Sequence, residues 1–369
     1  MNQLLKIGIS IGDKFSKWQY TQASMRGKKE YFENFKDEVL PALSSEERLL
    51  INKKWRGVCP DLSIGYHAYR VFKKYDKFDE HYVPESYFYP YIIRILNTTQ
   101  DFESLVHKGL IDSLFSDMSR PETLIKSFGS SFLDKNYSSI HREQIIDFLH
   151  SFDCDMIIKP AKDSNSGRGI SIINKDFNEI ELNNLIDLFH TDFVIQRIVN
   201  QSDFTSQFNP TSLNTFRILT LFLNGKCSLC YAILKLGAPG RFVDNGANGG
   251  LWVGVKKDGN LNDWGINFQG IVHYEHNGIS LKNKKVPNFE NIVSFAQKAH
   301  AHIPMCGLVG WDIALDSNEK PLLIEANMWW PGISYGEICS GPIFKSRTDE
   351  VIDYVKSQEL PRLGFRHKI

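Results

Sequence analysis

The sequence has no long apolar run and no excess of either charge. None of its hydrophobic stretches approaches the ~20 residues that a membrane-spanning helix needs. Lys plus Arg and Asp plus Glu both number 43, so the formal net charge is zero, which argues against a protein that binds nucleic acid or a membrane surface. The apolar start of the chain ends at Gly12 and Asp13, before a signal-peptide core forms. We therefore expect a cytoplasmic protein without nucleic-acid partners or membrane insertion.

Cysteine is sparse, and the sequence lacks the spacings of zinc ribbons, P-loops and hydrolase triads. Among six cysteines, Cys227 and Cys230 form one C-x-x-C inside a segment that has the pattern of a strand. Side chains three apart on a strand point to opposite faces, so one metal ion cannot easily bind both. We expect six reduced thiols rather than a metal or redox site.

Length and composition predict a globular protein of two or three lobes. Of its 369 residues, 42% are hydrophobic and 23% are charged. Helical patterns dominate the first 105 residues, for example at 44–54 and 65–74. Beyond residue 119, short apolar strands and helices mix without strict alternation. This order favours α+β lobes built on antiparallel sheets.

The segment 312–327 reads as a hairpin of two apolar strands, with a turn at Ser317 and Asn318. Each strand contains a carboxylate, Asp312 and Glu325, and Asn327 lies two residues beyond Glu325 on the same strand face. Oxygen ligands are those that Mg²⁺ selects, and carboxylates in buried strands are costly without a cation. A hairpin with hydrogen-bonded polar residues is the alternative.

Residues 157–173 form a second signal, because Lys159 and a proline end an apolar strand and a Gly/Ser loop follows. The loop contains Ser164, Ser166, Gly167 and Gly169 before a second strand begins. Hydroxyls and the N–H groups of a glycine-rich backbone suit phosphate oxygens, and Lys159 adds a positive charge. A solvent-exposed hairpin is the alternative for this segment alone.

Polar residues at two further strand ends are weaker signals. The strand at 193–199 carries Gln196 and leads to Gln201 and Asp203, which have acceptors for ribose hydroxyls, although an ordinary strand end explains the same pattern. Arg217 begins an apolar strand and needs a phosphate or carboxylate partner, which a buried structural ion pair would also supply. Lys235 suits a phosphate or substrate contact or an exposed surface equally well.

The order of these motifs resembles the ATP-grasp superfamily. It runs from a lysine on a strand through Lys-Pro, a Gly/Ser loop, a Gln-containing strand and N-T-x-R to Asp and E-x-N. The segments L-N-T-F-R-I and E-A-N-x-x-x-P-G resemble the sugar-transfer-associated subgroup in particular. The resemblance implies an α+β fold in which two lobes clasp ATP, preceded by a mainly helical N-terminal region. The implied divisions are 1–105, 106–195 for the first lobe, 196–345 for the second lobe with a metal site, and 346–369 for a C-terminal tail.

The resemblance also implies a role for each matching residue. Lys126 and Lys159 would approach the ATP phosphates, and the loop with Ser164, Ser166, Gly167 and Gly169 would close over them. The adenine hinge would be formed by Gln196, Arg197 and Ile198, and ribose would be contacted by Gln201 or Asp203. Lys235 would add a phosphate or substrate contact, Arg217 would steady the transferred phosphate, and Mg²⁺ would be bound by Asp312, Glu325 and Asn327. Many members carry an acidic pair at the hinge where this chain has Gln196 and Arg197.

The activity implied by the resemblance is ATP-dependent joining of a carboxylate to an amine through an acyl-phosphate. Both substrates would be small molecules, and the family name associates them with the sugars of surface polysaccharides. A kinase on the same fold and a non-catalytic ATP-binding module are the alternatives. The full set of Lys159, Arg217, Asp312, Glu325 and Asn327 argues against the non-catalytic module. The sequence does not indicate an oligomeric state.

Overall fold

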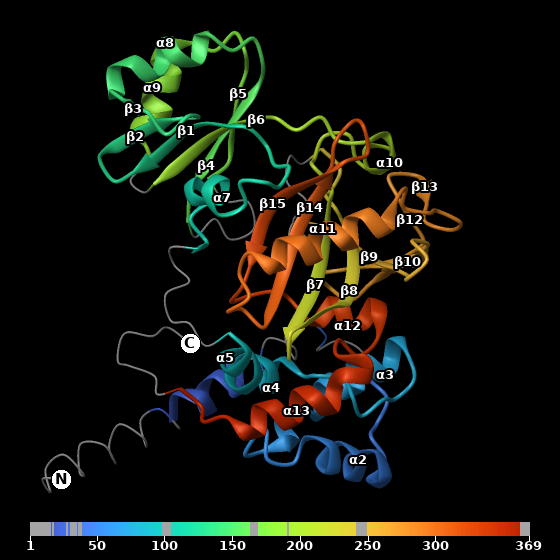
Figure 1. Cartoon of the computed structure of the whole chain (residues 1–369). Helices are drawn as coiled ribbons and strands as arrows, with labels where there is room; N and C mark the ends of the chain where they lie inside the picture. Colours follow the sequence, from blue (N-terminus) through green and yellow to red (C-terminus); the bar gives the residue numbers. More distant parts are fainter. Residues whose placement is uncertain are drawn as a thin grey trace, which may run out of the picture.

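The computed structural model describes residues 16, 18–26, 29, 35, 39–97, 105–162, 169–189, 192–240 and 249–361. Figure 1 shows three parts in these ranges. A small sheet carries α8 (Ile145–His150) and α9 (Glu179–Asp187), a larger sheet has α11 (Phe289–Ala301) across it, and helices from both ends of the chain gather beyond the larger sheet. The mixture of helices with antiparallel sheets is the α+β class expected from the sequence.

The smaller sheet has six antiparallel strands in the order β3-β2-β1-β6-β4-β5. These are β1 Thr123–Phe128, β2 Ser131–Asp134, β3 Ser139–Ile140, β4 Met156–Pro160, β5 Ser171–Ile173 and β6 Phe193–Arg197. Helices α8 (Ile145–His150) and α9 (Glu179–Asp187) form a core with Ile158 and Ile195 on one face. Because side chains alternate along a strand, Lys159 and Gln196 lie on the opposite face.

The larger sheet has seven antiparallel strands in the order β11-β10-β9-β8-β7-β14-β15. These are β7 Thr215–Leu223, β8 Lys226–Leu236, β9 Leu251–Val255, β10 Leu261–Asn267, β11 Val272–His273, β14 Leu308–Leu315 and β15 Pro321–Asn327. Successive side chains of β7 point to opposite faces of the sheet. Phe216 and Ile218 pack with α11, whereas Leu219 and Leu221 pack under the N-terminal helices. Arg217 therefore lies on the face turned away from α11.

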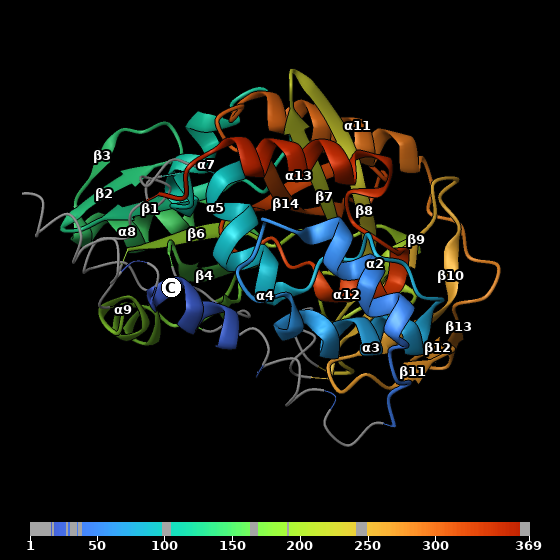
Figure 2. The same ribbon diagram turned by 90° about the horizontal axis from the view of Figure 1, so that it is seen from below.

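Helices from both ends of the chain share the core beneath that face. They are α2 Ser45–Trp55, α3 Tyr66–Tyr75, α4 Glu85–Tyr87, α5 Ile93–Leu96, α12 Ser334–Ser340 and α13 Thr348–Ser357. Figure 2, a view from below, shows α2, α3, α12 and α13 in front of the larger sheet. The start of α2 is set by a capping box, in which Ser44 and Glu47 each bond the other's backbone N–H. The divisions at residues 105, 195 and 345 stay predictions.

Asn97 connects the N-terminal helices to the larger sheet. Its side chain is 1% exposed; its amide donates to the carbonyls of Leu308 and Met328 at 2.8 and 2.6 Å, and its oxygen accepts from the N–H of Leu308 at 2.9 Å. Each backbone group would be left buried and unsatisfied without Asn97. One side chain thus fixes the position of α5 against β14 and the end of β15.

We expect Asn97→Ala to lower the free energy of unfolding by about 3 kcal/mol, because three buried hydrogen bonds are lost. Urea titration followed by circular dichroism measures the change. The matched control is Asn318→Ala, at an exposed turn position, which we expect to shift stability by less than ~0.5 kcal/mol. Equal effects from the two variants would contradict the role assigned to Asn97.

Candidate active site

A cavity of about 960 Å³ lies between the two sheets. Ten residues selected from the sequence line it: Lys159, Gln196, Arg197, Ile198, Gln201, Arg217, Lys235, Asp312, Glu325 and Asn327. They come from β4, β6, β7, β8, β14 and β15 and from the segment that follows β6. The fold therefore brings most of the predicted site into one place, and the role of each residue stays a prediction.

Four charged residues form a row across the larger sheet. Asp312 on β14 is directly opposite Arg217 on β7 and Glu325 on β15. Lys235 on β8 is opposite Thr215, which shares a strand face with Arg217 two residues away. Directly opposite residues on antiparallel strands also share a face. Strand register thus places all four charges at the cavity wall.

Asp312 is the centre of this row and is 5% exposed. Arg217 donates to both carboxylate oxygens, from Nε at 2.6 Å and from Nη2 at 3.0 Å, and Lys235 Nζ donates to Oδ2 at 3.3 Å. Burial alone would raise the pKa of Asp312, but Arg217 and Lys235 outweigh burial and hold the pKa at about 2. The carboxylate is therefore ionised at neutral pH.

The loop after β15 also binds Arg217. Arg217 Nη1 donates to the carbonyl of Pro331 at 2.6 Å. Gly332 follows with φ +73°, and a Cβ there would lie 3.2 Å from Arg217 Nη1. A Cβ on Gly310 would lie 2.7 Å from the Pro331 oxygen. Glycine at these two positions lets the loop approach the guanidinium closely.

Two buried lysines lie on the other side of the cavity. Lys108, at the start of α7 (Lys108–Leu114), donates to Glu325 Oε1 at 3.0 Å. Lys159 is buried, and burial followed by repulsion from Lys108 lowers its pKa from 10.5 to about 8. Two cations held near each other in a buried wall suit a polyanion such as a triphosphate.

At the predicted adenine hinge, a hydrogen-bond acceptor is open to a ligand, whereas two backbone donors are already used within the protein. The backbone N–H groups of Arg197 and Ile198 already donate to the carbonyls of Glu122 and Asp155, at 3.0 and 3.1 Å. The Gln196 amide donates to Thr123 Oγ1 at 2.8 Å. Gln196 Oε1 is buried without a hydrogen-bond partner in the described part of the chain. A ligand with an amino group would satisfy it.

Gln201 and Asp203, the two ribose candidates, differ in their surroundings. The Gln201 amide donates to the carbonyls of Asn209 and Ser212 and accepts from the backbone and side chain of Asn214. These bonds use Gln201 to fix the turn before β7. Asp203 is exposed in the first turn of α10 (Asp203–Ser206) and does not line the cavity.

Lys126 does not line the cavity either. Its Nζ is buried, 3.2 Å from Asp112 Oδ2 and 4.2 Å from the centre of the Tyr137 ring. Ser164, Ser166 and Gly167 lie outside the described residues. Gly169 has φ +75°, where a Cβ would lie 3.0 Å from Pro160. The nucleotide roles of these residues stay predictions.

Sequence reasoning missed Lys108, Glu85 and three aromatic side chains that line the same cavity, Trp252, Trp330 and Tyr335. A lone lysine at a helix start is ordinary on a surface. Only its contact with Glu325, 217 positions further along the chain, marks Lys108 as part of the site. The W-W-P-G segment beside E-x-N was the available signal for Trp330.

The donor set at the end of β15 fits Mg²⁺. Glu325 and Asn327 share a strand face, and Asn327 Nδ2 is buried without a hydrogen-bond partner in the described ranges. Amide oxygen and nitrogen exchange places by a simple rotation, so Asn327 can present its oxygen. A carboxylate has about four acceptor positions. Asp312 and Glu325 therefore keep lone pairs beyond their bonds to Arg217, Lys235 and Lys108.

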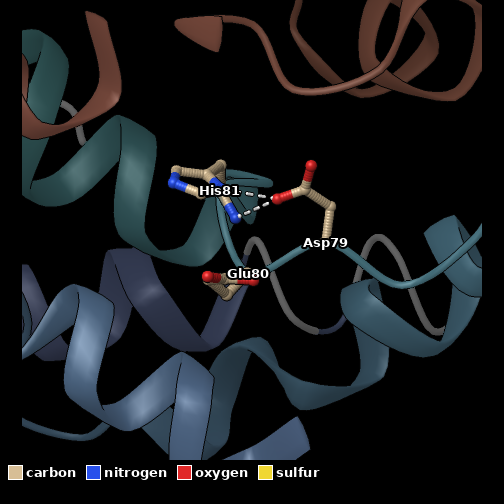
Figure 3. Close-up of side chains that lie close together, drawn as sticks. All are labelled: Asp79, Glu80 and His81. Atoms are coloured by element: carbon tan, nitrogen blue, oxygen red, sulfur yellow. Dashed lines mark hydrogen bonds and ion pairs between the residues drawn. The ribbon is translucent and has the colours of Figure 1, made fainter. Parts of the chain in front are cut away.

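Asp79, Glu80 and His81, among the N-terminal helices, form a second cluster of possible metal ligands, with one ligand atom from each residue within 4.8 Å of the others (Figure 3). Asp79 Oδ1 accepts from the His81 backbone at 2.9 Å and lies 2.6 Å from its Nδ1. The Glu80 carbonyl accepts from Trp55 Nε1 at 2.8 Å. These bonds explain the group as a local turn.

In the described part of the chain, no helix is long and apolar enough to cross a membrane.

A small sheet with two helices faces a larger sheet across the cavity, as expected of an ATP-grasp fold. Residues 92–353 match the model of the sugar-transfer associated ATP-grasp family. This range is well over half of the chain, so the chain belongs to that family. The expected fold and family are both confirmed. No curated protein matches the sequence.

Solved structures with similar chain traces include ligases. An L-amino acid ligase from Bacillus licheniformis is 12% identical, with a TM-score of 0.38 over 66% of this chain and 44% of that chain. D-alanyl-alanine synthetase A from Vibrio cholerae is 13% identical, with a TM-score of 0.39 over 69% and 63%. D-alanine–D-alanine ligase from Bacillus anthracis is 8% identical, with a TM-score of 0.38 over 68% and 66%. This chain thus spans less than half the length of the L-amino acid ligase and less than two thirds the length of the D-alanyl-alanine synthetase.

We expect Lys159→Met to raise the free energy of unfolding at pH 7 by on the order of 3 kcal/mol, because a buried charge with a lowered pKa is removed. In the wild type, the unfolded state binds more protons than the folded state between pH 8 and 10.5, so stability rises with pH there. The difference between variant and wild type should shrink over that window. Urea titrations from pH 7 to 10.5 measure it, and a variant less stable at pH 7 would contradict the burial argument.

Proposed function

We propose that this protein is an ADP-forming ligase that joins a carboxylate to an amine, acting on a small-molecule precursor of a surface polysaccharide. The observation that carries the proposal is the composition of the cavity. Buried Lys108 and Lys159 on one side face the row of Asp312, Arg217 and Glu325 on the other. This arrangement suits transfer of a phosphoryl group, which depends on charge neutralisation and positioning.

ATP would lie along the cavity with its phosphates at Lys108 and Lys159. Its adenine amino group would donate to Gln196 Oε1, the acceptor left unsatisfied at the hinge. Asp312, Glu325 and Asn327 would hold Mg²⁺, which neutralises phosphate charge when bound. The low pKa of Asp312 supports this assignment, because the carboxylate is an anion without any metal.

The reaction would take place beside Arg217. A carboxylate oxygen of the first substrate attacks the γ-phosphorus, the bond to the bridging oxygen breaks, and ADP leaves. The amine nitrogen of the second substrate then attacks the acyl carbon, phosphate leaves with the carbon–oxygen bonding electrons, and the nitrogen loses a proton. Asp312 and Pro331 hold Arg217 in a fixed position at the cavity wall, which supports a role in which its remaining N–H groups would donate to the transferring group without a large rearrangement.

We expect Glu325→Gln to retain the fold and to lower ADP formation by on the order of a hundredfold or more, because a ligand charge is lost. Glutamine keeps a side-chain oxygen that can accept from the Nζ of buried Lys108, so this lysine retains a hydrogen-bond partner. Glu181→Gln, exposed on α9, is the matched control and should keep full activity. ADP release is followed with a coupled assay and folding by thermal melting. Full activity in Glu325→Gln would contradict the assignment of Glu325 as a Mg²⁺ ligand.

We expect Arg217→Lys to lower kcat much more than it changes the KM for ATP, because lysine keeps a charge for Asp312 but loses the bidentate fork. The assay incubates ATP with carboxylate and amine pairs and detects the products by mass. ADP, phosphate and an amide that need both substrates support the ligase. A stable phosphorylated product that forms without the amine indicates a kinase. AMP as the nucleotide product would contradict both the ligase and the kinase, and no ATP turnover with any pair indicates an ATP-binding module.

A further inference from the structure

The cavity continues past the charged row into an aromatic half. Trp252 on β9 is directly opposite Lys235 on β8, so the two side chains share a sheet face. The row therefore extends in the order Glu325, Asp312, Arg217, Lys235 and Trp252 across neighbouring strands. Strands lie about 4.8 Å apart, so the two ends are about 19 Å from each other. Trp252 is thus well separated from the proposed phosphate end.

Aromatic side chains from three elements line this half. Tyr335 of α12 stacks on Trp252 with ring centres 3.9 Å apart and an angle of 18°. Trp330, from the loop that Arg217 holds, is 62% exposed, and its ring lies 4.6 Å from that of Tyr89. An indole this exposed contributes little to the core. Its ring is therefore accessible at the wall of the cavity.

The N-terminal helices contribute a carboxylate to the same half. Glu85 begins α4, lines the cavity and accepts a hydrogen bond from Ser334 Oγ. The segment is firmly held, because the N–H of Val83 donates to buried Glu337 at 2.9 Å. Glu85 is therefore a fixed part of the wall rather than a side chain on a loose segment.

Most charged side chains of the cavity lie away from the aromatic half, and Lys235, directly opposite Trp252, lies at the boundary with its Nζ directed to Asp312. Its lysine and arginine side chains are Lys108, Lys159, Arg197, Arg217 and Lys235 in the described ranges. Lys108 pairs with Glu325, Arg197 with Glu122, and Arg217 and Lys235 with Asp312. The aromatic half has Glu85 and ring faces, whose quadrupoles are negative. An anion suits the lysine end, and a cation suits the aromatic end.

We propose that the aromatic half binds the amine substrate as its ammonium ion, with Glu85 as the charged anchor and Trp252 and Trp330 as the ring faces. The ammonium ion would transfer one proton to the Glu85 carboxylate. The resulting free amine would then approach the acyl carbon from the side opposite the nucleotide, beside Arg217. The inference rests on the proposed function only in naming the cation as a substrate. Binding of a cation in this half can be tested without ATP and without turnover.

The test compares two probes of similar shape and different charge. Benzylamine is an ammonium ion at neutral pH, whereas benzyl alcohol is neutral. Ligand-observed NMR titrations of the full chain give both dissociation constants. We expect the wild type to bind benzylamine about tenfold more tightly than benzyl alcohol, as a charge-assisted contact in a partly enclosed site would give. Glu85→Gln should remove that preference. Glu46→Gln, exposed in the same helical region, should keep it.

A second variant separates binding from folding. Trp330→Leu removes an exposed ring, so we expect unchanged melting and benzylamine binding weakened about fivefold. Equal affinity of the wild type for the two probes, no measurable benzylamine binding, or a preference that survives in Glu85→Gln would overturn the inference. Preserved discrimination by charge with no ligase activity would reject the proposed reaction alone. The two failures are therefore distinguishable.

Discussion

The buried ion pair between Arg217 and Asp312 is the interaction on which the site depends. It joins two central strands of the larger sheet through two hydrogen bonds of 2.6 and 3.0 Å. Breaking a buried pair from one side costs several kcal/mol, because the remaining charge is left without a partner. The same guanidinium holds the loop after β15 through Pro331. One pair thus fixes the charged row, the loop with Trp330 and the boundary between the two halves of the cavity.

The cavity also explains why the N-terminal helices belong to the site. Their core is shared with β7, β8, α12 and α13 rather than being separate. Asn97 and Val83 bond directly to the larger sheet and to Glu337 of α12. The Glu85 carboxylate, which these helices carry, is held at the cavity wall by its bond from Ser334. The region that carries no nucleotide motif forms a wall of the same cavity.

Function and stability oppose each other at the lysine end. Burial lowers the pKa of Lys159 to about 8, which means that its charge is held against a desolvation cost. Lys108 adds repulsion, and its contact with Glu325 offsets part of the cost. Under the proposed function, a polyanion bound between the two lobes would neutralise both lysines. The proposed ligase and the stability of the free protein therefore place opposite demands on the same side chains.

The sequence by itself determined the local elements and the ordered motifs. Apolar alternation predicted β4, β7, β14 and β15 within a few residues, and the hairpin carried Asp312, Glu325 and Asn327 as a recognisable set. It did not predict β9, α12 or the cavity role of Lys108 and Trp252. Periodicity fixes which face of a strand is apolar, but which strands become neighbours depends on contacts between residues far apart in the chain. Only the tertiary structure, through the order and register of five strands, placed Trp252 on the same sheet face as Glu325, and only the packing of the N-terminal helices brought Glu85 to the wall of the same cavity.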